Sequence, residues 1–187
     1  MREIRQFPKS VFSLADLRKV SQLRESSLKT TLSRALKSGE IVRLAGGWYA
    51  ADLAKISWEN LAVSIYHPSY VSFESALNFY NILSQQSAAL TLATVNRAKK
   101  LAKHGQLISY RHISPNLFWG YRKEGNFWLA EPEKAWLDLA YLSLNGYGYF
   151  SPEEMNLELL DVKKVKAYLR KFNNFRLKKI IKATGLI

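Results

Sequence analysis

The sequence predicts an α+β fold divided into two domains, residues 1–56 and residues 57–187. Two short helix patterns and a hairpin pattern fill the first domain, whereas strand-like runs alternate with helix signals after residue 57. The distribution of charge supports the division. Residues 1–56 hold 11 basic and 5 acidic side chains (net +6), residues 57–150 hold 8 and 6 (net +2), and residues 151–187 hold 9 and 4 (net +5). Two basic ends therefore flank a nearly neutral middle.

Composition limits the function. The chain has 187 residues, 48% of them hydrophobic, and a formal net charge of +13. This apolar content is enough for a packed core, and the charge favours a polyanionic partner: DNA, RNA or an anionic membrane face. The absence of cysteine excludes disulfides, thiol nucleophiles and cysteine zinc sites. The three histidines, His67, His104 and His112, lack metal-ligand spacing, so we predict no metal and no cofactor.

Membrane insertion is not expected. The first residues lack the apolar stretch of a signal peptide. No run of about 18 apolar residues occurs, as a membrane-spanning helix would require. These observations predict a cytoplasmic protein.

The first helix of the N-terminal pattern is predicted from Ser13 to about Val20. Ser13 and Asp16 have the spacing of a capping box, and Leu14, Leu17 and Val20 form one apolar stripe. A short turn over residues 21–24 follows. Upstream, only Arg2–Gln6 precede Pro8, which predicts either a single helical turn or extended chain there.

A second helix is predicted from Glu25 to Lys37, ending at Gly39, a residue type favoured just past a helix end. Its apolar stripe consists of Leu28, Leu32, Ala35 and Leu36. The opposite face is small and polar at its start and basic later, without an acid after Glu25. This face carries Ser26, Ser27, Lys29, Thr30, Ser33, Arg34 and Lys37.

Two β-rich runs, residues 41–44 and 48–50, flank Gly46 and Gly47. Tight hairpin turns need positive φ, so the two glycines predict a hairpin. The order helix, turn, helix, hairpin is that of a winged helix-turn-helix, which places its second helix in the major groove of DNA. We expect Ser26, Ser27, Lys29 and Thr30 to approach base edges. Arg34, Lys37, Arg43 and the Gly46–Gly47 wing would hold the DNA backbone. The alternative is that these charges only solvate the outer face of a helix.

The middle of the chain predicts a helix over residues 57–66, a strand and a helix within residues 70–81, and a helix over residues 131–142. In the last helix, Lys134 and Asp138 can pair at i,i+4. Strands are predicted at residues 90–95, 107–113, 118–121 and 127–130, with a basic connection over residues 96–105.

The C-terminal region predicts a helix start at Ser151–Glu154 and two basic amphipathic helices, residues 161–172 and 174–184, the second burying Phe175. Three functions stay open for these basic residues: a solvated face on core helices, a phosphate-binding surface, or a membrane-binding helix. A second basic surface would combine them with the basic connection: Arg97, Lys99, Lys100, Lys103, Lys163, Lys164, Lys166, Arg170, Lys171, Arg176, Lys178, Lys179 and Lys182.

Three segments, together with the winged pattern, resemble the AbiEi antitoxin family. They are Tyr70-Val-Ser-Phe-Glu-Ser-Ala-Leu-Asn-Phe-Tyr80, Leu117-Phe-Trp-Gly-Tyr121 and Leu129-Ala-Glu-Pro-Glu-Lys-Ala-Trp-Leu-Asp-Leu-Ala-Tyr-Leu142. The resemblance implies the antitoxin of a type IV toxin–antitoxin pair in phage abortive infection. It also implies a winged domain that represses its own promoter at inverted repeats. The C-terminal domain would counter a nucleotidyltransferase-like toxin without forming a stable complex with it.

Two other functions remain open. Glu131, Glu133 and Asp138 lie close in sequence and would suit a nucleic-acid-processing enzyme with a metal-binding acid cluster. However, acids in a first helical turn are also explained by the helix dipole. No phosphate-binding loop of the Walker type and no Ser–His–Asp arrangement occurs, so we predict that the chain is not an enzyme. The other alternative to the antitoxin is a ligand-sensing transcriptional regulator whose middle domain holds a small molecule.

Overall fold

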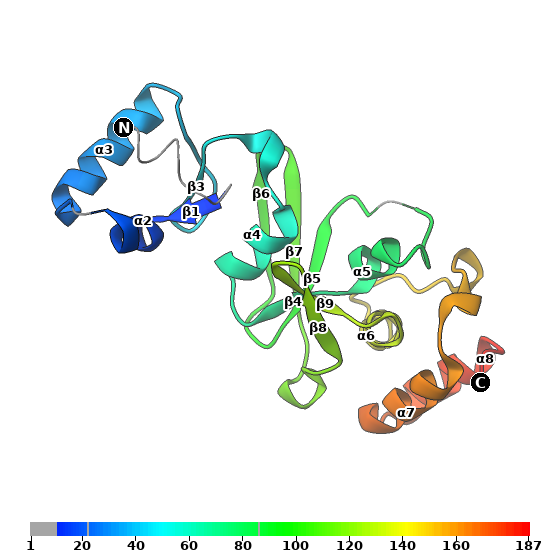
Figure 1. The fold of residues 1–187 in the computed structure, drawn as a ribbon. Helices are drawn as coiled ribbons and strands as arrows, with labels where there is room; N and C mark the ends of the chain where they lie inside the picture. The colour runs from blue at the N-terminus through cyan, green and yellow to red at the C-terminus, as the bar shows by residue number, and fades with distance from the viewer. Residues whose placement is uncertain (1–10, 22, 86) are drawn as a thin grey trace. The chain divides into compact units, whose positions relative to one another are not determined.

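The computed structural model describes residues 11–21, 23–85 and 87–187, and it has a mixed α+β fold with two β-sheets (Figure 1). The chain divides into two compact units. The first contains the chain up to Ile65 together with Lys103–Gly105, and the second contains Tyr66–Ala102 and Gln106–Ile187. The predicted α+β class is confirmed. The segment Arg2–Gln6, predicted as a helical turn or extended chain, lies outside the described residues.

The first unit has a three-stranded antiparallel sheet of order β1-β3-β2 and a set of short helices. Its elements are β1 (Val11–Ser13), α2 (Leu14–Val20), α3 (Glu25–Lys37), β2 (Val42–Arg43), β3 (Trp48–Ala50) and α4 (Trp58–Ile65). The predicted capping box is confirmed, since Asp16 N donates to Ser13 Oγ (3.1 Å) and Ser13 N donates to Asp16 Oδ2 (2.9 Å). Strand β1, before this cap, was not predicted.

Two apolar clusters hold the first unit together. One joins Phe12, Leu17 and Tyr49 to the buried stripe of α3. The other joins β1, β2 and β3 to Leu61 of α4, with Trp58 and Ile65 packed against it. Helix α4 therefore belongs to the first unit, which extends past the predicted boundary at residue 56. Val20, predicted in the buried stripe of α2, is 61% exposed because the helix ends there.

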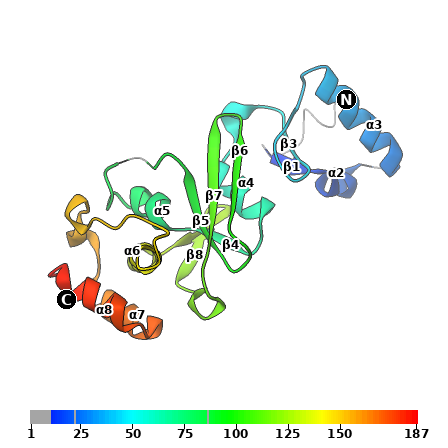
Figure 2. The same cartoon turned by 180° about the vertical axis from the view of Figure 1, so that it is seen from behind.

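The second unit is built on a six-stranded mixed sheet of order β6-β7-β5-β4-β9-β8. Strand β4 runs antiparallel to β5 and parallel to β9, and β5 runs parallel to β7. Helix α6 contacts α5, α7 and α8; α5 also packs against strand β5, whereas α7 and α8 lie beyond α6, farther from the sheet (Figure 2). The elements are β4 (Ser69–Val71), α5 (Phe73–Phe79), β5 (Leu90–Thr94), β6 (Lys99–Lys103), β7 (Gln106–His112), β8 (Tyr121–Glu124), β9 (Phe127–Ala130), α6 (Pro132–Ser143), α7 (Val162–Phe172) and α8 (Phe175–Ala183).

Three secondary-structure predictions in this unit are wrong in detail. The basic connection contains strand β6, which pairs with β7 at the edge of the sheet. The strand predicted at residues 118–121 starts only at Tyr121, because a 3-10 turn occupies Pro115–Leu117. Ser151 starts only a 3-10 turn, Pro152–Glu154. After it, Met155 forms an isolated antiparallel bridge with Leu83, Asn156 N donates to Ile82 O (2.8 Å), and a second 3-10 turn covers Leu157–Leu159.

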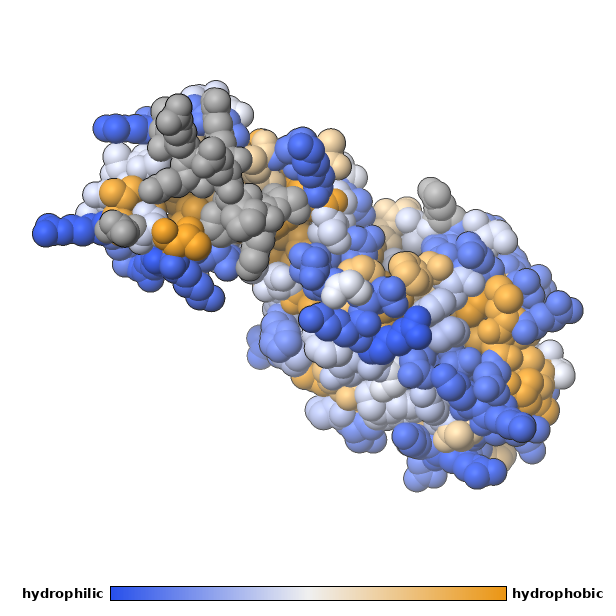
Figure 3. Space-filling model, viewed as in Figure 1, coloured by the Kyte–Doolittle hydropathy of each residue, from blue (hydrophilic) through white to orange (hydrophobic). Residues whose placement is uncertain are grey.

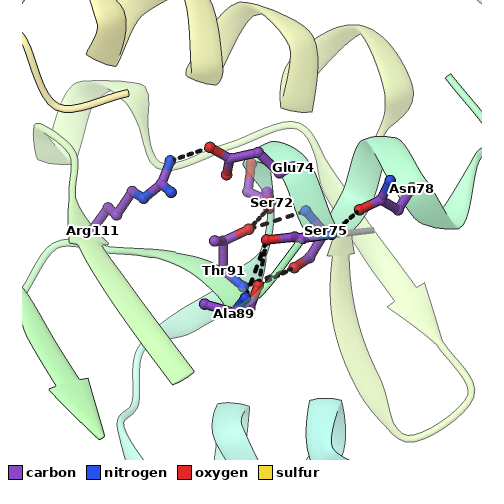
Figure 4. A network of polar contacts seen from close by, with 8 residues as sticks. Ser72, Glu74, Ser75, Asn78, Ala89, Thr91 and Arg111 are labelled. Carbon is purple, nitrogen blue, oxygen red and sulfur yellow. Dashed lines mark hydrogen bonds and ion pairs between the residues drawn. The ribbon is translucent and has the colours of Figure 1, made fainter. Parts of the chain in front are cut away.

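Hydroxyl groups attach the start of α5 to strand β5 (Figure 4). Thr91 N donates to Ser75 Oγ (2.8 Å), Ser75 N donates to Thr91 Oγ1 (3.1 Å), and Thr91 Oγ1 donates to Ser72 O (2.8 Å). Between these contacts, Phe73 has a φ of +55°, a conformation that a bulky residue adopts only when its surroundings enforce it. The bonds on both sides of Phe73 supply that enforcement.

A fully buried ion pair lies between α6 and β4. Lys134 and Asp138 pair at i,i+4, as the sequence predicts, and both side chains have no exposed surface. Tyr70 Oη and Ser72 Oγ donate to Asp138 Oδ2 at 3.1 and 3.0 Å, and Lys134 Nζ donates to Tyr70 Oη at 3.0 Å. Desolvation lowers the pKa of Lys134 and raises the pKa of Asp138, and their mutual attraction opposes both shifts.

We predict that Asp138→Ala destabilises the second unit by about 3–5 kcal/mol, because it leaves the Lys134 ammonium buried without a counter-charge. Urea unfolding followed by tryptophan fluorescence measures this loss. The double variant Lys134→Met/Asp138→Leu is the control, and it should lose much less because neither buried charge remains. Equal losses in the single and double variants would contradict this account.

Candidate nucleic-acid interface

The polar and basic residues predicted on the second helix lie on the exposed side of α3. Leu28, Leu32 and Ala35 are buried in the first unit's core, so they fix the orientation of the helix. The exposed residues are Ser26, Ser27, Lys29, Thr30, Ser33, Arg34 and Lys37. We call this set the α3 face.

Contacts within the α3 face differ along its length. Glu25, at the start of the helix, pairs with Arg18 of α2 and with Lys29 (2.8 Å). Thr30 Oγ1 donates to the carbonyl of Ser26 (3.0 Å). Beyond Glu25 the helix sequence contains no acid, so Arg34 and Lys37 give its second half a uniformly positive charge.

The predicted hairpin joins β2 and β3. Leu44 N donates to Trp48 O (2.9 Å), and Trp48 N donates to Ala45 O (3.0 Å). Gly46 and Gly47 have φ values of +60° and +81°, which explains why glycine occupies the turn. The Arg43 side chain on β2 is exposed, and its carbonyl lies 3.0 Å from His104 Nε2. No local pattern predicts this contact, because His104 follows Arg43 by 61 positions.

The residues of the predicted second basic surface do not form one surface. Arg97, Lys99 and Lys100 lie at or before the edge strand β6, whereas the basic residues of α7 and α8 lie beyond α6, and the two groups are apart in both ribbon views (Figures 1 and 2). Lys103 is the last residue of the same strand, β6. Sequence proximity therefore did not predict which cations share a face.

The basic residues of α7 surround an apolar stripe, Val165, Leu169 and Phe172, that packs inward. Figure 3 shows hydrophilic residues over most of the visible side of this helix. Two of its lysines have partners within the unit: Lys171 lies 4.7 Å from the Trp119 ring centroid, and Lys164 Nζ lies 3.3 Å from Glu131 Oε2. The prediction that α8 buries Phe175 is wrong, because Phe175 is 81% exposed at the first position of the helix.

The three acids considered for catalysis point to separate partners. Glu131 accepts hydrogen bonds from Tyr168 and Lys164, Glu133 Oε1 accepts from Asp161 N (3.0 Å), and Asp138 pairs with Lys134. Across residues 11–21, 23–85 and 87–187, no group of three or more His, Cys, Asp or Glu side chains is arranged to hold a metal ion. The acids thus make structural contacts between α6, α7 and β4.

No helix within the described part of the chain is long and apolar enough to cross a membrane. A scan against models of known protein families and a search of curated proteins gave no match to this chain. The geometry of the α3 face and the hairpin therefore carries the functional argument, together with the motifs of the sequence.

We predict that Tyr168→Phe raises the pKa of Glu131. Partial burial alone would raise this pKa, but the hydrogen bonds from Tyr168 and Lys164 lower it below its usual range. Because folding lowers this pKa, Glu131 stabilises the folded chain at pH values above its unfolded pKa. This stabilisation is lost as the pH falls through the folded pKa. NMR titration of Glu131 in both proteins measures the change. An unchanged titration would show that the Tyr168 hydroxyl does not stabilise the carboxylate.

Proposed function

We propose that the chain is a sequence-specific DNA-binding protein whose first unit is a winged helix-turn-helix. The observation that carries this proposal is the α3 face. Its small hydroxyl side chains come first, its cations follow, and the opposite side of the helix is locked into the core. Such a helix can place its start against base edges in the major groove while its later cations reach phosphates.

The hairpin supplies the second point of contact. Its glycine turn is exposed or half-buried, and Arg43 on β2 is exposed, so the loop can follow the DNA backbone or the minor groove as a wing. The net charge of +13 adds a sequence-independent attraction to the duplex. In this proposal Ser26, Ser27, Lys29 and Thr30 read bases, and Arg34, Lys37 and Arg43 hold phosphates.

The biological role that we propose is autorepression by a type IV antitoxin. The chain would bind inverted repeats in its own promoter, and its second unit would counter a nucleotidyltransferase-like toxin without a stable complex. Support comes from the AbiEi-like segments 70–80, 117–121 and 129–142. They contribute Tyr70, Ser72, Lys134 and Asp138 to one buried cluster, and Gly120 lies against the Lys134 side chain, so the resembling segments pack together.

We predict that Arg43→Ala weakens binding to all DNA sequences and lowers the slope of log K against log salt by about one, because one phosphate contact is lost. Gel shifts on the upstream promoter across a salt series measure the slope. Lys55→Ala is the matched control, since Lys55 is an exposed cation of the same unit outside the proposed interface. An equal change in both variants would argue against a wing contact.

We predict that Ser27→Ala costs about 1–3 kcal/mol at one operator position and relaxes the preference there, as expected for a lost base contact. Competition gel shifts with single-base operator variants measure the effect. A uniform loss across all operators would place Ser27 on the backbone instead. Absence of retardation of the promoter at low salt would overturn the DNA-binding proposal.

Co-expression tests the antitoxin role. Growth arrest by a nucleotidyltransferase-like toxin encoded beside this chain should be relieved by the full chain, and equally by Arg43→Ala, which affects only DNA binding. Failure of the full chain to relieve the arrest would overturn the antitoxin role and leave the DNA-binding proposal intact.

A further inference from the structure

A cavity of about 690 Å³ opens on the second unit, on the side of the sheet edge formed by β6 and β7. Its volume lies within the range of about 300–1,000 Å³ that is typical of small-molecule sites. The walls come from three segments that are distant in sequence: the start of β6, the end of β7, and the end of α6 with the loop after it. The lining residues are Ala98, Lys99, Lys100, Ser109, Tyr110, Arg111, His112, Leu142 and Tyr147.

The charge of this cavity is one-sided. Three of the nine described lining residues are permanent cations, Lys99, Lys100 and Arg111, and none of the nine is an acid. Lys99 and Lys100 have exposed side chains. Lys99 Nζ lies 5.3 Å from the Tyr66 ring centroid and would turn away from that ring to reach an anion. Ser109 and His112 add groups that can hydrogen-bond phosphate oxygens. The lining therefore suits a ligand that carries several negative charges.

One of the cations is held in place. Arg111 Nη1 donates to Glu74 Oε1 (2.9 Å; Figure 4). The guanidinium also lies 5.1 Å from the Phe73 ring centroid. The bond to Glu74 uses Nη1. A guanidinium has five N–H donors, so Arg111 can donate to a ligand while it keeps this bond. Arginine in a fixed orientation is suited to phosphate recognition, because little side-chain entropy is lost on binding.

The cavity also offers aromatic surface. Tyr147 lines it and is 72% exposed, and Leu142 adds an apolar wall. A planar base can stack on an exposed tyrosine ring, and such stacking tolerates different bases. The cations suit the phosphates of a nucleotide, and the exposed ring suits its base.

We propose that this cavity is a binding site for a nucleoside polyphosphate. Lys99, Lys100 and Arg111 would hold the phosphates, and Tyr147 would stack on the base. The site lies wholly within the second unit and does not depend on DNA binding by the first unit.

Isothermal titration calorimetry of the full chain with ATP, GTP, CTP and UTP, at fixed ionic strength and without DNA, tests the proposal. We expect saturable binding of at least one triphosphate at one site per chain. Its nucleoside alone and inorganic phosphate should each bind at least about tenfold more weakly, because each lacks half of the contacts. Absence of saturable binding by all four triphosphates would overturn the proposal.

Variants test the location of the site. Lys99→Ala/Lys100→Ala should weaken binding about tenfold or more through lost charge-assisted bonds, and Tyr147→Ala should weaken it severalfold. The matched control is Lys163→Ala/Lys166→Ala on α7, which removes the same charge from the same unit. Thermal unfolding checks that each variant is folded. If the control pair weakens nucleotide binding equally, the proposed site is overturned. The proposal is also overturned if the chain binds a single-stranded oligonucleotide but no mononucleotide.

Discussion

The second unit depends on one buried ion pair, Lys134 with Asp138. Two buried charged groups are tolerated only when nearly all their hydrogen-bond donors and acceptors have partners. Tyr70 and Ser72, on and just after strand β4, supply those partners, so the pair fixes how α6 lies on the sheet. Space is limited as well: a Cβ at Gly120 would come within 3.0 Å of the Lys134 side chain. The rings of Trp119, Tyr70 and Phe172 lie 5.0–5.6 Å from the ammonium and surround it.

The two units place their charge differently. In the first, a small core determines which side of α3 is exposed, and the proposed DNA interface consists of residues that remain outside that core. In the second, the cations of α7 are partly engaged by Trp119 and Glu131, whereas Lys99 and Lys100 of β6 border a cavity. The cations of one chain thus have different surroundings, and only the local partners of each cation distinguish them.

Local patterns in the sequence predicted local structure well. The Ser13–Asp16 cap, the stripe of α3 and the limits of α7 and α8 depend on neighbours within one or two helical turns. Long-range packing could not be predicted in this way. The i,i+4 spacing showed that Lys134 and Asp138 can pair, but their burial depends on Tyr70 and Ser72, which are 64 and 66 positions away from their partners. Strand β6 was missed because its lysines show no alternation, and the cavity was missed because its walls meet only in the folded chain.

The strand order leaves β6 and β8 at the two ends of the six-stranded sheet. Unpaired edges of this kind invite another strand to join, which leads to aggregation. Both edge strands carry exposed cations, Lys99, Lys100 and Lys103 on β6 and Arg122 and Lys123 on β8. On β8, Arg122 pairs with Glu124. Two molecules approaching through their β6 edges would bring like charges together, so electrostatic repulsion opposes pairing there.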